Sequence, residues 1–186
     1  MTDRRTKYCA YSQPSFPFRN RLRRAFWGSV LETLFRPSPR MSHCWRSWLL
    51  RMCGAEIGTG CHIYPGVVIW APWNLICEDE VGVASGAILY NQAPITLGRR
   101  CVISQGAHLC SGSHDYTSEG FELFAKPIQV GALAWVAAEA FIHPGVCIGE
   151  GAVIGARSVV TKDMPEWTVC AGHPCVPIKP RKINRG

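Results

Sequence analysis

Aliphatic or small residues recur at every sixth position through most of this 186-residue chain, and this spacing restricts the fold more than any other feature. A period of six fits neither an α-helix, with about 3.6 residues per turn, nor a plain strand, which repeats every second residue. It is typical of short parallel strands that are separated by tight turns and wound into a triangular coil. The fifteen key positions are Ile57, Ile63, Ile69, Leu75, Val81, Ala87, Leu97, Ile103, Leu109, Val130, Val136, Ile142, Ile148, Ile154 and Val160.

Two further regularities support this interpretation. The fourth residue after a key residue is usually small, as in Cys61, Ala107 and Ala152, whereas Trp73 and Asp79 are exceptions. Each strand should therefore send one aliphatic and one small side chain inward, and fifteen hexads predict about five coils. Glycine often follows the key residue, and we attribute this to turns that need its conformational freedom. These glycines are Gly58, Gly82, Gly98, Gly131, Gly149 and Gly155.

Composition and charge narrow the class of protein. Hydrophobic residues make up 47% and charged residues 18% of the chain, which excludes disorder for most of it. No run of 18 apolar residues occurs, so a membrane-spanning helix is not expected. Met1 to Ala10 are polar and basic with no apolar stretch behind them, so a secretory signal is not expected either. The ten cysteines contain no Cys-x-x-Cys pair, so we expect reduced thiols and a cytoplasmic location. The basic ends lack a recognised nucleic-acid motif, and we expect no nucleic-acid partner.

The chain divides into three predicted regions. Residues 1–54 form a basic, helical N-terminal segment, 55–165 form the repeat domain, and 166–186 form a basic tail. Residues 88–96 and 115–127 interrupt the repeat and should be expelled from the coils as loops.

The N-terminal segment contains two apolar stripes at helical spacing, from Leu22 to Phe35 and from Met41 to Met52. One interpretation is that both helices cap the open end of the coils. The other is peripheral contact with the inner face of the cell membrane, because four arginines lie beside Phe26 and Trp27. These arginines are Arg19, Arg21, Arg23 and Arg24.

The motif Leu109-Cys-Ser-Gly-Ser-His114-Asp115, the run from Ile142 to Asp163 and the ending Val169-Cys-Ala-Gly-His-Pro174 resemble the hexapeptide-repeat acyltransferases. The similarity covers roughly residues 55–180 and is nearest to the colanic acid, or exopolysaccharide, biosynthesis acetyltransferases. It implies an all-β, left-handed parallel β-helix, assembly as a homotrimer, and acetyl-CoA as the acyl donor. It also implies a sugar or glycan hydroxyl as acceptor.

His114 is the expected general base, because it matches the catalytic histidine of the family. An imidazole titrates near neutral pH and can accept the hydroxyl proton as oxygen attacks a thioester. The other candidates, His62, His108, His143 and His173, are assigned surface or packing roles.

The resemblance also assigns the donor and acceptor sites. Thr161 and Lys162 match its donor-site pair, and Ala138 and Ala156 match positions that offer backbone groups to pantetheine. Lys179 in the basic tail is a candidate for a donor phosphate. Asn91 and Asp115 are candidates for binding the acceptor. Ala137 departs from the pattern, since many relatives have glycine there.

Four alternatives remain open at this stage. The first takes Cys110, near His114, as a nucleophile that forms an acyl-enzyme. A zinc hydratase with three histidines is disfavoured by the spacing of His108 and His114, and no metal is expected. A third alternative is that the chain is a trimeric scaffold without catalysis, since fold does not imply function. The last alternative is an acetyltransferase whose acceptor is a small molecule other than a sugar.

Overall fold

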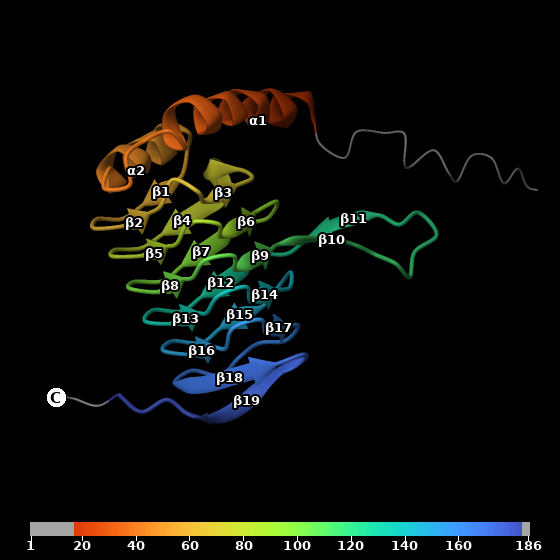
Figure 1. The fold of residues 1–186 in the computed structure, drawn as a ribbon. Coiled ribbons are helices and arrows are strands. Elements are labelled where there is room, and N and C mark those ends of the chain that lie inside the picture. The colour runs from red at the N-terminus through yellow and green to blue at the C-terminus, as the bar shows by residue number, and fades with distance from the viewer. Residues whose placement is uncertain (1–16, 184–186) are drawn as a thin grey trace, which may run out of the picture.

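The protein is a prism of stacked coils closed at one end by helices, as Figure 1 shows. The structure is a computed structural model and describes residues 17–183. Parallel pairing joins equivalent strands of successive coils into three faces, and five complete coils are present. The predicted fold class, a β-helix of about five coils with a helical N-terminal segment, is confirmed.

Each face is one sheet. The first face contains β1 (Glu56–Ile57), β4 (Leu75–Cys77), β7 (Ile95–Leu97), β12 (Ile128–Val130) and β15 (Cys147–Ile148). The second contains β2 (His62–Ile63), β5 (Gly82–Val83), β8 (Val102–Ile103), β13 (Trp135–Val136), β16 (Val153–Ile154), β18 (Thr168–Gly172) and β19 (Cys175–Pro180). The third contains β3 (Val68–Ile69), β6 (Ile88–Tyr90), β9 (His108–Cys110), β14 (Phe141–Ile142) and β17 (Val159–Val160).

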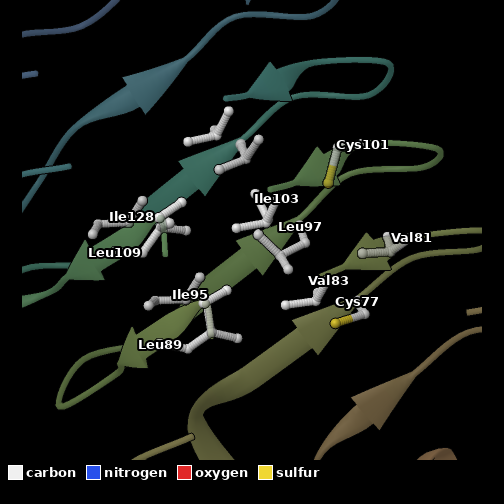
Figure 2. Packing of buried hydrophobic residues seen from close by; sticks show 14 of the residues in the cluster. Cys77, Val81, Val83, Leu89, Ile95, Leu97, Cys101, Ile103, Leu109 and Ile128 are labelled. Atoms are coloured by element: carbon white, nitrogen blue, oxygen red, sulfur yellow. The ribbon is translucent and has the colours of Figure 1, made fainter. Parts of the chain in front are cut away.

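The core is a stack of like side chains from successive coils. In Figure 2, Cys77, Val83 and Leu89 of the second coil lie next to Leu97, Ile103 and Leu109 of the third. Each of the six side chains is at most 3% exposed. Because every coil covers the apolar surface of the one before it, the hydrophobic effect stabilises the stack along its whole length.

The predicted frame is wrong in the second coil. Pairing joins Ile57 to Cys77, a spacing of 20 residues, and Val130 to Ile148, a spacing of 18. The two extra residues lie in the corner that contains the short 3-10 helix η3 (Pro72–Asn74). Trp73, one exception to the small-residue pattern, lies in this corner, and Asp79, the other, follows β4. A second corner of the same length separates β6 from β7, within the predicted loop 88–96.

The glycines after the key residues have a different role from the one predicted, because their φ values are not positive. A Cβ atom on Gly149 would lie 2.4 Å from the backbone nitrogen of Glu166, and one on Gly98 would lie 2.5 Å from that of Ala132. These glycines therefore allow close approach of adjacent coils, except Gly82, where the nearest atom would lie 3.8 Å from an added Cβ. Left-handed turn conformations fall elsewhere and include non-glycine residues such as Glu80 and Arg157, with φ of 60° and 57°.

The helices close the end of the prism at its first coil. They comprise α1 (Phe18–Val30), a π-helical turn η2 (Leu31–Phe35) and α2 (His43–Met52). Trp27, Leu31, Phe35, Leu49 and Leu50 are buried and belong to the same core as the coils.

A buried arginine fastens the second helix. Arg46 is 0% exposed, and its Nε donates to the carbonyl of Ile63 at 2.6 Å. Its Nη1 and Nη2 atoms donate to Ser38 Oγ and to the carbonyls of Pro39 and Arg40 at 2.7–2.8 Å. Burial lowers the pKa of this guanidinium, and the carbonyl acceptors compensate for the water it loses. These hydrogen bonds hold α2 against the first coil.

Candidate active site

A two-stranded hairpin leaves the prism at the end of the third coil and holds His114. We call residues 111–127 the arm. Its strands β10 (Gly112–His114) and β11 (Leu123–Ala125) are antiparallel, with His114 opposite Leu123. The buried Ser111 anchors its base, because its Oγ donates to the carbonyl of Tyr90 at 3.0 Å. Figure 1 shows the arm extending well beyond the coils.

The orientation of the His114 ring is fixed by Phe121. His114 Nδ1 lies 2.9 Å from the Phe121 carbonyl oxygen, and the two rings stack with centroids 4.6 Å apart and an angle of 6°. A carbonyl oxygen only accepts hydrogen bonds, so Nδ1 must hold the proton. The lone pair of the neutral imidazole is then on Nε2, on the exposed side chain of His114. This is the tautomer that a general base at Nε2 requires.

Phe121 was not found by sequence reasoning. Its φ of 46° lies in the left-handed region, which is uncommon for a bulky residue. The turn that produces this conformation points its carbonyl toward His114. The only sequence signal is an aromatic residue seven positions after the histidine, and this is too weak to predict the contact.

Asp115 holds the turn of the arm through hydrogen bonds to Thr117. Its Oδ1 accepts hydrogen bonds from the Thr117 amide at 2.9 Å and from the Thr117 hydroxyl at 2.6 Å. These hydrogen bonds lower the pKa of the Asp115 carboxyl below its usual value. The Phe121 carbonyl, rather than this carboxylate, orients the base.

Asn91 is placed where it cannot reach an acceptor without breaking existing bonds. It is 0% exposed, its Oδ1 accepts from the Ala71 amide at 2.9 Å, and its Nδ2 donates to the Ala71 carbonyl at 2.6 Å. The side chain satisfies backbone groups at the corner of the first coil, which is the normal requirement for buried peptide groups. The structure thus gives Asn91 a structural role in place of the predicted acceptor contact.

The predicted donor residues lie at opposite edges of the third face. Ala138 and Ala156 occupy the turns before β14 and β17, and the Arg157 amide donates to the Ala138 carbonyl at 2.9 Å. Thr161 and Lys162 are exposed and follow β17 at the other edge, which is also the edge where the arm leaves. Lys179 is exposed on β19, at the end of the second face. One chain therefore brings Thr161 and Lys162 to the edge of the arm and leaves Ala138, Ala156 and Lys179 apart from it.

Cys110 has the properties of an inactive thiol. Burial raises the pKa of Cys110, and its Sγ lies 3.1 Å from the Gly112 carbonyl as a hydrogen-bond donor. A nucleophilic cysteine needs a lowered pKa. These contacts weaken the reading of Cys110 as an acyl carrier.

A hollow of about 540 Å³ lies on the outside of the second face, away from the arm. Its wall includes Arg40, Tyr64, Val83 and Ser104, and none of the predicted site residues. We therefore place the candidate active site at the arm, where a base with the required tautomer is present, and not at the hollow.

Comparison with known proteins identifies relatives over nearly the whole chain, although no family model matches. The chain is 43% identical over 162 residues to WcaF of Escherichia coli strain K12, which is named as an acetyltransferase of colanic acid biosynthesis. The match covers 87% of this chain and 89% of WcaF. Galactoside O-acetyltransferase of the same organism is 36% identical over 125 residues, covering 67% of this chain and 56% of that protein.

Solved structures share the fold. The hexapeptide-repeat acetyltransferase VCA0836 from Vibrio cholerae superposes with a TM-score of 0.81 at 24% identity, covering 90% of this chain and 95% of that one. A maltose O-acetyltransferase from Clostridium difficile superposes with a TM-score of 0.77 at 23% identity, covering 90% of each chain. The sequence identity to WcaF and this architecture lead to one conclusion: the chain is an acetyltransferase and belongs to the hexapeptide-repeat family.

Proposed function

We propose that this protein transfers an acetyl group from acetyl-CoA to a hydroxyl of a sugar unit during exopolysaccharide assembly, with His114 as the general base. The observation that supports this most directly is the bond from His114 Nδ1 to the Phe121 carbonyl, which leaves Nε2 free to accept a proton. The relationship to WcaF supports the pathway, and the relationship to galactoside O-acetyltransferase supports a sugar acceptor.

The reaction needs one base and no covalent intermediate on the protein. Nε2 takes the acceptor hydroxyl proton while the oxygen attacks the thioester carbonyl. The tetrahedral intermediate then collapses, the C–S bond breaks, and the thiolate leaves with the proton returned by the imidazolium. Phe121 stabilises the imidazolium in two ways, because its carbonyl accepts from Nδ1 and its ring stacks against the cation.

Acetyl-CoA is the donor that we propose, and a structure of VCA0836 with acetyl-CoA has the same fold, with a TM-score of 0.82 at 22% identity. Thr161 and Lys162 would hold it at the edge of the third face that faces the arm. The Asp163 carboxylate fixes this corner by accepting from the Cys147 amide at 2.8 Å. Ala138 and Ala156 present small side chains that allow a pantetheine chain to approach the backbone, and Lys179 suits a phosphate.

The placement of these residues supports a site shared between copies. The edge with His114 and Thr161 and the edge with Ala138 and Ala156 are separated by the strands of the third face. A second prism beside the first would bring the edge with His114 and Thr161 of one copy next to the edge with Ala138 and Ala156 of the other. We therefore propose a homotrimer. Because acetyl-CoA is made and used inside cells, we also propose a cytoplasmic location.

The test is release of free CoA thiol from acetyl-CoA over a panel of sugars, nucleotide sugars and lipid-linked glycans. We expect acceptor-dependent release that falls by about 10²-fold or more in His114→Ala. His62→Ala, which changes an exposed histidine on the first coil, is the matched control and should retain activity. If the wild-type trimer binds acetyl-CoA but releases thiol only with non-sugar acceptors, the acceptor is a small molecule other than a sugar. A trimer that neither binds nor turns over acetyl-CoA would favour the alternative that the protein is a scaffold without catalysis.

A further inference from the structure

The helical cap, residues 18–53, combines exposed apolar side chains on its outer side with a net positive charge. We infer that this surface binds the face of an anionic lipid bilayer. The inference concerns the cap alone and does not depend on the acetyl transfer proposed above.

Apolar side chains on the two helices divide into a packed set and an exposed set. Trp27 and Leu31 face the coils, and Trp27 Nε1 donates to the Ile69 carbonyl at 2.7 Å. On the opposite side of α1, residues spaced by four form a row with exposures of 62–76%. Helix α2 adds Met52 at 69% and a stacked pair of tryptophans at 5.1 Å. The exposed set comprises Phe18, Leu22, Phe26, Trp45, Trp48 and Met52.

The apolar row of α1 borders a groove. Leu22, Phe26 and Met52 line it together with Arg23 and Trp73, and its volume is about 490 Å³. Exposed apolar surface of this kind, next to basic side chains, marks a contact with another molecule or with a membrane.

The distribution of charge favours an anionic bilayer over the other possible binding partners of the cap. Between residues 18 and 53 there are eight arginines and one acid, Glu32, whereas residues 54–183 hold eight basic and eleven acidic residues. An anionic surface would attract the cap and repel the rest of the prism. Two caps would repel each other, which disfavours a second copy bound cap to cap.

The arginines are arranged in two groups. Arg23 and Arg24 lie over the rings of Trp73 and Trp70, at 4.1 and 4.3 Å from the ring centroids, and hold α1 against the first coil. At about 100° per residue, Arg19 and Arg21 fall on either side of the row formed by Phe18, Leu22 and Phe26. Both are exposed. Basic residues on both flanks of an apolar row are the arrangement of a helix that lies in a lipid interface.

The position of the cap fits this role. Figure 1 shows the helices at the end of the prism, across the first coil and opposite β18 and β19. Prisms that associate side by side would leave this end free, so the caps of an oligomer could contact one membrane together. Among the described residues no helix is long and apolar enough to cross a membrane, so the contact proposed is with its surface.

The experiment is flotation of the full-length protein with vesicles of phosphatidylcholine, with and without phosphatidylglycerol, at low and high salt. We expect binding only to the anionic vesicles, and weaker binding at high salt. Phe18→Ser combined with Leu22→Ser and Phe26→Ser should lower the partition coefficient on the order of 100-fold. Arg19→Glu with Arg21→Glu should lower it by about tenfold or more.

The matched control is Val176→Ser with Ile178→Ser, which changes exposed apolar residues of β19 at the other end of the prism. It should bind vesicles as the wild type does. Each variant is first checked for wild-type circular dichroism and oligomeric size. Absence of wild-type binding, equal binding to neutral vesicles, or an unchanged partition coefficient in the α1 variants would each overturn the inference. A loss of oligomer in the α1 variants would assign the row to a contact between copies and overturn it as well.

Discussion

The coils and the arm are held together in different ways. Strands of the second, third and fourth coils pair with neighbours on both sides, and the inward side chains from Ile95 to Leu109 are completely buried. The arm consists of one antiparallel pair, with Tyr116 86% exposed and Phe121 39% exposed. This difference separates two properties. The coils determine the stability of the fold, whereas the arm determines where the base lies and which of its nitrogens can accept a proton.

The largest expected effect is on stability, from a cavity in the coils. Ile103 is 0% exposed in the middle of the stack shown in Figure 2, and Ile103→Ala should lower the free energy of unfolding by about 2–5 kcal/mol. Tyr116→Ala, on the arm, should change it by less than about 0.5 kcal/mol. Urea denaturation at fixed protein concentration measures both. Equal losses in the two variants would show that the arm contributes to the core.

Next in size is a pair of identical substitutions at two glycines. Gly149→Ala should destabilise by about 1–3 kcal/mol, because the added Cβ would lie 2.4 Å from the Glu166 nitrogen. Gly28→Ala adds a Cβ with nothing within 4 Å, inside α1. It should stabilise by roughly 0.5–1 kcal/mol, since alanine is the better helix former. Thermal unfolding of both variants checks the sign. A neutral Gly149→Ala would mean that the coils can move apart at little cost.

A smaller effect should appear in the arm, in activity and not in stability. Phe121→Ala removes the ring that stacks on His114 but keeps the carbonyl, so we expect kcat to fall by about tenfold. KM for acetyl-CoA should not change, and Phe121→Tyr should restore kcat because it keeps the ring. A drop in unfolding free energy similar to that of Ile103→Ala would assign Phe121 to the fold instead.

The smallest effect concerns pH and the junction of the cap with the coils. Burial lowers the pKa of His43, and the nearby Arg46, His62 and Arg40 act in the same direction, while the Ile63 carbonyl opposes them. His43 also stacks on His62 at 4.7 Å and meets Tyr64 edge to face at 5.0 Å. Below about pH 6.5 the unfolded chain therefore binds a proton that the folded chain resists, and stability should fall as the pH falls.

His43→Gln should remove part of this pH dependence. The measurement is the Tm of the wild type and the variant at a series of pH values from 8 to below about 6.5, the ordinary pKa of histidine. A parallel decline in wild type and variant would show that other groups determine the acid sensitivity.

Sequence reasoning predicted the fold class because a six-residue period has few structural solutions. It assigned the wrong frame to the second coil because two inward positions per hexad are both apolar, so Leu75 and Val81 fit either frame. It also assigned turns to glycines such as Gly149, since a sequence does not show that the backbone of the next coil lies beside them.

The candidate site was predictable only in part. His114 stands in a recognisable motif, but the predictions for Asn91 and Asp115 required knowledge of which backbone groups need partners. The Asn91 side chain is hydrogen-bonded to the backbone of Ala71, which is 20 residues away. The Asp115 carboxylate accepts a hydrogen bond from Thr117 in the same turn. The path of the backbone decides which of its groups need a side-chain partner, and the six-residue period does not show that path.

The sequence by itself determined the stacked coils, because burial of aliphatic side chains at a fixed spacing is a local rule that repeats along the chain. Only the tertiary structure decided which nitrogen of His114 is free and which face of α1 is exposed. The first depends on the Phe121 carbonyl, presented by a left-handed residue in the turn segment that precedes β11. The second depends on where the first coil lies, because packing against it buries Trp27 and leaves Phe26 in solvent.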